Sequence, residues 1–281
     1  MVIRYDRPNL LVATKGHPFD KAAFCGLFDR LQGFTSQGFT WTHVEQPAAA
    51  RLLDPRMAED FAAIVFYDLP GLRFRARRPP DLIEPTDAMK EGFEALLAAG
   101  KPLVFLHHAI AGWPTWDRYA EAIGTRFFYR PGSYKGRDYP DSGYRSAVRY
   151  EADVVAGHPV TEGLPERIAF EDELYLMPLL EPDVAPLVRA RFDFVAGNFH
   201  SAAAAVEGRA ESRDGWTHPP GTDLIAWARR AGRSPVVVIQ CGNDGATFSN
   251  PAFERLLGNA VAWVTSPQAA AWAAGRDGST P

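Results

Sequence analysis

The sequence predicts an α/β fold: a doubly wound, mostly parallel sheet with helices on both faces. Two observations support this fold class. Short apolar runs typical of buried strands recur at residues 9–14, 61–68, 102–109 and 234–242. Amphipathic helical patterns lie between most of them, and strands that alternate with helices are typical of a parallel sheet covered on both sides.

The first half of the chain predicts a regular series of elements. Apolar residues at helical spacing mark the helices, Thr86 is placed to cap the second of them, and Gly124 is placed to end the third. The strands are apolar runs bounded by turn residues. This half is expected to hold strands at 9–14, 39–45, 61–68 and 102–109, and helices at 19–31, 86–100 and 115–124.

The second half predicts a different kind of sheet before it returns to a buried strand and a helix. The runs at 186–192 and 223–230 resemble strands that pair antiparallel. The apolar run at 234–242 then predicts a last buried strand. A helix over 250–264 follows, with Asn250 at its N-cap and Pro251 at its first position.

We expect one α/β domain over residues 1–266, with two irregular parts. Residues 127–155 are rich in Tyr, Arg, Gly and Pro, and are expected to leave the regular alternation as an excursion with short strands. Residues 193–222 are expected to form a long surface loop, and such loops are often functional. The Ala-, Gly- and Ser-rich C-terminal tail, 267–281, is expected to fray.

Composition and charge exclude several classes of partner. The net charge of −4 over 281 residues provides no basic surface for nucleic acid. No apolar stretch is long enough to span a bilayer and no signal peptide is evident, so we expect no membrane association and a cytoplasmic location. Neither glycine-rich nucleotide motif is present, which argues against a nucleotide cofactor.

Five motifs, taken in order, resemble those of one family. They are TKGHPFD after the first strand, YDLPG after the third, FLHHA after the fourth, GHPVTEGLPERIAFEDELY at 157–175, and SPVVVIQCGNDGATFSNPAFERLLGNAVAWV at 234–264. Together they resemble the ThuA-like (trehalose-utilisation) proteins over roughly residues 8–265. This resemblance implies a flavodoxin-like, class I glutamine amidotransferase-like fold with a pocket at the carboxyl edge of the strands.

The resemblance also implies a role in the catabolism of disaccharides or other sugars, often beside an oxidoreductase that makes 3-keto sugars. Amidotransferases of this fold carry a nucleophilic cysteine after the strand that ends here at His107 and His108. Cys25 and Cys241 lie elsewhere, so the chain is not expected to be a glutaminase.

Three histidines at strand ends are the first candidates for a site. His107 is expected to act as a base or as a metal ligand, because ligands bind at the carboxyl ends of parallel strands. The alternative is a histidine that binds loop backbone. His108 is a candidate for substrate binding, but both rings line one pocket only if the turn begins between them. His17, after the first strand, is a further catalytic candidate, and otherwise a surface turn residue.

The acidic segment FEDELY supplies the second group of candidates. On an extended strand Glu171 and Glu173 share one face and Asp172 takes the other. Glu173 and Asp172 are candidate acid or base groups, Tyr175 is a candidate for substrate binding, and the alternative is a solvated acidic turn. Glu173 and His107 are also the candidate metal ligands, with zinc one option.

Other candidates follow from their place at strand ends or in the excursion. Asp68 closes the third strand, and Asn243 and Asp244 follow the last one; each is expected either to contact substrate or to accept backbone amides. In the excursion Tyr134 and Arg145 are candidates to cover the pocket, as part of a set that also includes Tyr129 and Tyr144. The alternative for this segment is a packed surface loop.

These residues lead to two hypotheses. The first is an enzyme that acts on a glycoside or keto-sugar by acid–base chemistry, with or without a metal and without a cysteine nucleophile. It would be a hydrolase, a lyase or an isomerase. The second is a non-catalytic sugar-binding or accessory protein. In both the partner is a small sugar or glycoside, and assembly into a homo-oligomer is left open.

Overall fold

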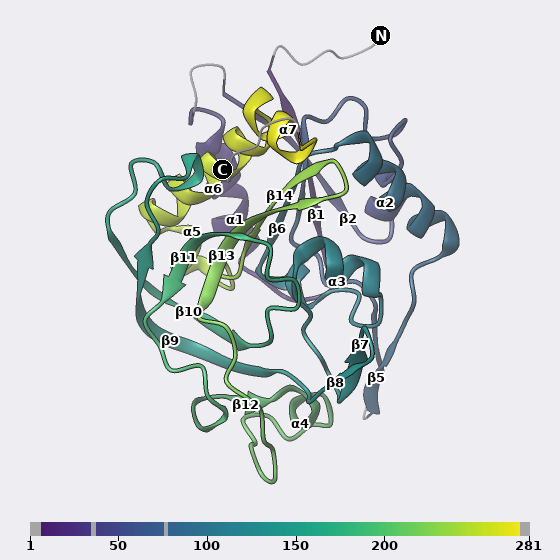
Figure 1. Ribbon diagram of the computed structural model, residues 1–281, viewed down its shortest axis with the longest axis vertical. Coiled ribbons are helices and arrows are strands. Elements are labelled where there is room, and N and C mark those ends of the chain that lie inside the picture. Colours follow the sequence, from purple (N-terminus) through teal and green to yellow (C-terminus); the bar gives the residue numbers. More distant parts are fainter. Residues whose placement is uncertain (1–6, 35–37, 76–77, 276–281) are drawn as a thin grey trace.

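The computed structural model describes residues 7–34, 38–75 and 78–275. These residues form a ten-stranded mixed sheet in the order β10-β9-β11-β13-β14-β6-β3-β1-β2, with β12 paired to β9 (Figure 1). Two antiparallel hairpins, β4-β5 and β7-β8, lie outside it. The α/β class predicted from the sequence is therefore confirmed. In the part of the chain so described, no helix is long and apolar enough to cross a membrane.

Five neighbouring strands of the sheet are parallel. Each corresponds to a run that the sequence marked as a strand, and β1, β3, β6 and β14 are buried along their whole length, as expected for the centre of such a sheet. The five strands are β1 (Asn9–Thr14), β2 (Thr40–Glu45), β3 (Ala63–Phe66), β6 (Leu103–Leu106) and β14 (Ser234–Ile239).

The other half of the sheet is antiparallel and continues from β14. The predicted antiparallel pairing of the runs at 186–192 and 223–230 is confirmed, since they form β11 and β13. The antiparallel strands are β9 (Gly143–Val154), β10 (Arg167–Leu176), β11 (Ala185–Ala190), β12 (His200–Ser201) and β13 (Leu224–Ala231). The hairpins outside the sheet are β4 (Leu72–Arg75) with β5 (Arg78–Leu82), and β7 (Gly132–Tyr134) with β8 (Arg137–Tyr139).

Three helices begin at residues whose side chains cap them. The Asp20 side chain accepts from the Ala23 amide, Thr86 caps the second helix, and Asn250 caps the long C-terminal one. The helices are α1 (Lys21–Leu31), α2 (Asp87–Ala99), α3 (Asp117–Ile123), α4 (Ala202–Val206), α5 (Gly245–Phe248), α6 (Pro251–Val264) and α7 (Pro267–Ala273). Short 3₁₀ turns are η1 (Ala49–Leu52), η2 (His107–Ala111), η3 (Pro159–Thr161) and η4 (Ala196–Asn198).

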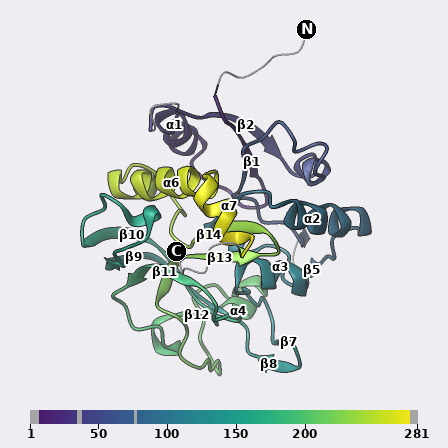
Figure 2. The same ribbon diagram turned by 45° about the horizontal axis from the view of Figure 1, so that its top comes forward.

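Helices cover both faces of the sheet, as the sequence predicts (Figure 2). Alternate residues of β1 enter different hydrophobic clusters. Leu10 and Val12 pack with α1 and α6, whereas Leu11 and Ala13 pack with α2 and α3. Because side chains alternate across a strand, one buried strand serves both clusters.

Residues 127–155 are more regular than expected. Only the part up to Tyr139 is a local excursion with short strands, while β9 is a twelve-residue strand of the main sheet. Along β9 the buried Val148, Tyr150 and Ala152 alternate with charged, exposed residues. This alternation is that of a half-buried strand, and the charged residues on its outer face obscure the pattern in the sequence.

The tail and the region after β3 also differ from expectation. The expectation that the tail frays is wrong for residues 267–273, which form α7 with Pro267 at its first turn and Ser266 as its cap; residues 276–281 lie outside the described part. Residues 193–222 form the expected long loop, broken only by η4, β12 and α4 among the described elements. The β4-β5 hairpin was not predicted, because its arginine-rich sequence lacks a clear apolar alternation.

The packing of α7 predicts that Trp272 contributes to stability. Its indole is 5 % exposed, lies 5.3 Å from the Trp263 ring, and is covered by the Arg230 guanidinium 4.7 Å from its ring centroid. Trp272→Ala should therefore lower the free energy of unfolding by about 3 kcal/mol in a urea titration. The exposed Gln268→Ala on the same helix should change it by less than about 0.5 kcal/mol. Equal stabilities for the two variants would show that α7 does not pack as described.

Candidate active site

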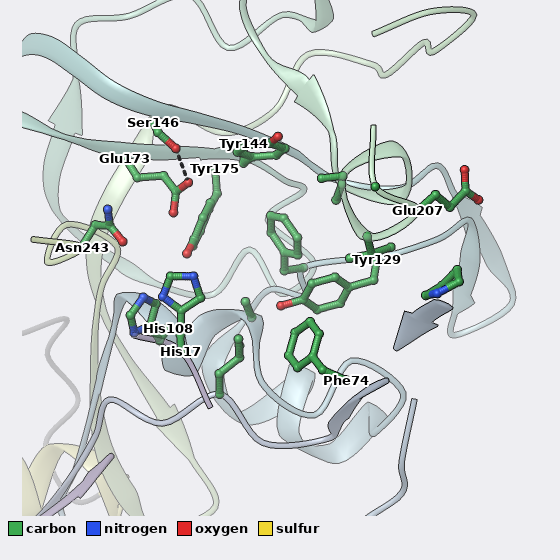
Figure 3. A pocket seen from close by; sticks show the side chains of 18 residues that line it. His17, Phe74, His108, Tyr129, Tyr144, Ser146, Glu173, Tyr175, Glu207 and Asn243 are labelled. Atoms are coloured by element: carbon green, nitrogen blue, oxygen red, sulfur yellow. Dashed lines mark hydrogen bonds between the residues drawn. The ribbon is translucent and has the colours of Figure 1, made fainter. Parts of the chain in front are cut away.

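The carboxyl ends of the parallel strands border one cavity of about 840 Å³ (Figure 3). His17 follows β1, His108 is the second residue of the turn η2 after β6, and Asn243 follows β14. Glu173 and Tyr175 reach the same cavity from β10, in the antiparallel half of the sheet. Histidines and acids that are distant in sequence therefore converge at this edge.

His107 supports the cavity from behind. It is not among the lining residues, its side chain is fully buried, and its φ of 31° places a non-glycine residue in the left-handed region. Its Nδ1 lies 2.5 Å from the Gln240 carbonyl oxygen. Because a carbonyl only accepts, Nδ1 carries a proton and donates it, which leaves Nε2 as the nitrogen that faces the site.

The Nε2 atom of His107 contacts both Glu173 and Tyr175. It lies 3.2 Å from Glu173 Oε2 and 2.8 Å from the Tyr175 hydroxyl, whose ring stacks on the imidazole at 4.7 Å. Glu173 Oε1 in turn accepts from the Ser146 hydroxyl at 2.9 Å. The Glu173 carboxylate is thus held by two side chains, while 14 % of it remains exposed to the cavity.

The pairing of His107 with Glu173 sets the charge of both groups. Burial opposes the charged form of His107, but the hydrogen bond and charge of Glu173 outweigh it and raise the pKa of His107 above 6.5. Burial likewise opposes ionisation of Glu173, and the hydrogen bond and charge of His107 reverse this effect and lower the pKa of Glu173. Each group therefore favours the charged form of the other, and the pair is stabilised as an imidazolium beside a carboxylate.

His108 is the neutral counterpart of this pair. Burial lowers its pKa well below 6.5, and the nearby His107 and His17 lower it further. Its ring lies 4.9 Å from the ring of His107 and is 2 % exposed, and neither of its nitrogens has a hydrogen-bond partner within normal distance. Buried polar atoms are normally paired, so His108 carries an unsatisfied donor and an unsatisfied acceptor just beneath the wall of the cavity that its ring lines.

His17 and Asp172 complete the polar end of the site in different ways. His17 is exposed, lines the cavity, and its ring lies 4.4 Å from that of His108. Asp172 does not line the cavity. Its carboxylate is fully buried and accepts the backbone amides of Glu173, Gly242 and Asn243 at 2.6–3.0 Å. Asp172 thereby fixes the backbone of Glu173 and of Asn243, the two of these residues that line the cavity.

The expectation that Glu171 and Glu173 share one face of β10 is confirmed. Burial alternates along this strand, with Asp172 on the buried side and Glu171 and Glu173 on the other. The register shift between Asp172 and Leu174 comes from one extra residue in β9, between Val148 and Arg145. Glu171 lies on the exposed surface, where Arg149 Nε donates to it at 2.8 Å, whereas Glu173, one turn of the pleat further on, lines the cavity.

Four other candidates lie away from the cavity. Asp244 accepts the first amides of α5 as its N-cap, and the Tyr134 hydroxyl donates to Glu181. Arg145 donates to the Asn198 carbonyl. Asp68 is buried at the end of β3, where Gln46 donates to its Oδ2 at 2.7 Å. None of the four lines the cavity.

The excursion does reach the cavity, through other side chains. Tyr129, Tyr144 and Ser146 line it, together with Phe127. The two tyrosines belong to the aromatic set noted in the sequence. The apolar wall from α4 and the hairpin residue Phe74 were missed. The α4 segment is only alanines and a valine, and the hairpin around Phe74 has no periodic pattern.

The proposed metal ligands do not form a metal site in the described part of the chain. No three His, Cys, Asp or Glu side chains stand close enough there to hold an ion, and zinc in proteins normally has three or four protein ligands.

Comparison with known proteins identifies the family. The family described as ThuA, trehalose utilisation, matches residues 10–264. The chain belongs to this family, which confirms the resemblance seen in the sequence. No protein with a curated description matches the chain significantly.

Two solved structures are similar over nearly the whole chain. One is a ThuA-like protein from Bacteroides uniformis ATCC 8492, with a TM-score of 0.59 and 16 % identity, covering 95 % of this chain and 94 % of that one. The other is a ThuA-like protein from Parabacteroides merdae ATCC 43184, with a TM-score of 0.62 and 16 % identity, covering 92 % and 90 %. At this level of identity they show a shared fold.

The burial of Asp68 predicts a pH-dependent stability. Burial raises the pKa of Asp68 to about 6, against 3.8 for the ordinary group. A folded-state pKa above the unfolded value gives stability that is complete below about pH 4 and is lost as pH rises through 6. Two pKa units correspond to about 3 kcal/mol.

In urea titrations the stability of the wild type should fall by about 3 kcal/mol relative to Asp68→Asn between pH 4 and pH 8. The exposed Asp60→Asn is the matched control and should follow the wild type across this range. A wild-type–Asp68→Asn difference that stays constant with pH would contradict the assignment.

Proposed function

We propose that the protein is an enzyme that acts on a keto-sugar or glycoside by general acid–base chemistry in this cavity. The observation that carries the proposal is the ionised Glu173 beside the neutral His108, with His107 bonded behind the carboxylate. Membership of a family described as trehalose utilisation supports a sugar as the substrate class. A glutamate base with a neutral imidazole is one known arrangement for proton transfer beside a ketone.

The fold supports a ligand at this place. The five parallel strands run in the order β2-β1-β3-β6-β14, and we propose for them a doubly wound, flavodoxin-like connectivity. In such sheets ligands bind at the carboxyl ends of the strands, where the cavity lies. A cysteine nucleophile has no support: Cys241 is buried, Cys25 lies in α1, and neither lines the cavity.

The proposed reaction begins at the carbon next to the ketone of a 3-keto sugar. The Glu173 carboxylate accepts the proton of that carbon, and the electron pair of the C–H bond moves toward the ketone oxygen to form an enolate. The N–H of His108 donates a hydrogen bond to this oxygen, where negative charge develops. Elimination of the neighbouring glycosidic oxygen and isomerisation share this first step.

His107 acts in this proposal as a positioning residue. Its charge keeps Glu173 ionised in a site whose burial would otherwise favour the neutral acid. The Gln240 carbonyl holds Nδ1, so Nε2 stays directed at the carboxylate. The base is therefore ready to accept a proton at neutral pH without first losing one.

Glu173→Gln should remove most of the activity on a 3-keto disaccharide. The amide keeps the shape of the side chain but accepts no proton, and a positioned general base contributes about 10²–10⁴-fold in rate. We therefore expect kcat to fall by that factor. Steady-state kinetics with purified protein measures this loss.

Glu171→Gln is the matched control, since it removes a carboxylate two residues away that faces solvent. It should keep wild-type kcat. Equal activity of the two variants would show that Glu173 is not the base. Binding of the sugar by the wild type without any turnover would instead favour the non-catalytic sugar-binding function.

His107→Gln should shift the pH profile of the enzyme. Without the cation, burial raises the pKa of Glu173 unopposed, so the fall of kcat/KM on the acid side should move to higher pH. A merely structural role would lower the rate at every pH and leave that limb in place. If kcat/KM of His107→Gln falls on the acid side at the same pH as in the wild type, His107 does not position Glu173 as proposed.

A further inference from the structure

We infer, on the basis of the proposed function, that the substrate is a glycoside with an apolar, ring-sized aglycone. The aglycone would lie at the end of the cavity formed by Phe74, Tyr129 and α4. The aglycone is the group that leaves with the glycosidic oxygen. In a disaccharide this group would be a second hexose instead.

The cavity has two ends of different chemistry. In Figure 3, His17, His108, Glu173 and Asn243 gather at one end, while Phe74, Tyr129 and Glu207 lie toward the other. A volume of about 840 Å³ lies toward the upper limit of pockets that hold a drug-sized ligand, so a sugar ring at the polar end leaves room for a second group.

The far end offers few partners for hydroxyl groups. Most side chains that line the cavity beyond its polar end have no donors or acceptors: Phe74, Pro79, Phe127, Ala202, Ala205 and Val206. The polar groups there are the Tyr129 hydroxyl and the Glu207 carboxylate, whose Oε2 already accepts from Arg209 Nη2 at 2.7 Å. The Tyr144 hydroxyl already accepts the Glu211 amide at 2.9 Å. A second hexose would bring several hydroxyls into a region with too few hydrogen-bonding groups to replace their water.

Phe74 supplies a second, independent observation. It is 60 % exposed, and of the three large hydrophobic side chains with high exposure in the described residues, it alone lines the cavity. An aromatic face left in water at the edge of a pocket gains most from an apolar ring that covers it. Val206, on α4, presents an aliphatic surface to the same space.

The test compares three 3-keto-glucosides that differ only in the aglycone: methyl, phenyl and glucosyl. We expect kcat/KM for the phenyl glycoside to exceed that for each of the other two by about tenfold or more. The phenyl ring fills the apolar end of the cavity, whereas the methyl group leaves it empty and the glucosyl group brings hydroxyls into it. Phe74→Ala and Val206→Asp should each lower the phenyl-to-methyl ratio by about tenfold. Met57→Ala, which removes an equally exposed side chain away from the cavity, should leave the ratio unchanged.

The outcomes separate this inference from the proposed function. Turnover of all three glycosides with the glucosyl compound equal to or better than the phenyl one would overturn the inference and leave the enzyme function intact. If none is turned over, the proposed function fails, and calorimetric binding of the same three compounds decides the inference. Tighter binding of the phenyl glycoside, weakened by Phe74→Ala, supports it, and equal binding of all three overturns it.

Discussion

The hydrogen bond between His107 Nε2 and Glu173 Oε2 is the contact on which the site depends. It joins the parallel half of the sheet, where His107 follows β6, to β10 at the far edge of the antiparallel half. Neither group would be charged so deep in the protein alone, because burial opposes both ionised forms. Each therefore sets the protonation state of the other, and both set the chemistry that the cavity can perform.

The surrounding bonds hold this pair in one geometry. Gln240 uses its carbonyl for His107 Nδ1 and its side-chain oxygen for the Tyr175 amide, at 2.6 Å. Asp172 binds the amides on both sides, in β10 and in the loop after β14. A buried acid that accepts three backbone amides acts as a structural clamp, which explains why the most buried carboxylate of the segment is not the one that faces the cavity.

The sequence predicts the part of this site that strand order determines. His17, His108 and Asn243 follow parallel strands, and such strand ends meet at one edge of the sheet. The contribution of Glu173 depends on the antiparallel pairing that brings β10 to this cavity, and that pairing leaves no mark in the local residue pattern. Long-range pairing also brings in the wall of α4, whose Ala-rich sequence contains nothing that indicates a ligand. Local sequence patterns therefore predict the residues at the polar end of the cavity, whereas its apolar end is evident only from the fold.

The pairing of His107 with Glu173 is tested most directly by the protonation state of the adjacent histidines at pH 7, read from the nitrogen-15 NMR spectrum of their side chains. We expect His107 to be an imidazolium with both nitrogens protonated and His108 to be a neutral imidazole. A neutral His107 at this pH would contradict this pairing, because Glu173 would then lack the partner that keeps its carboxylate charged.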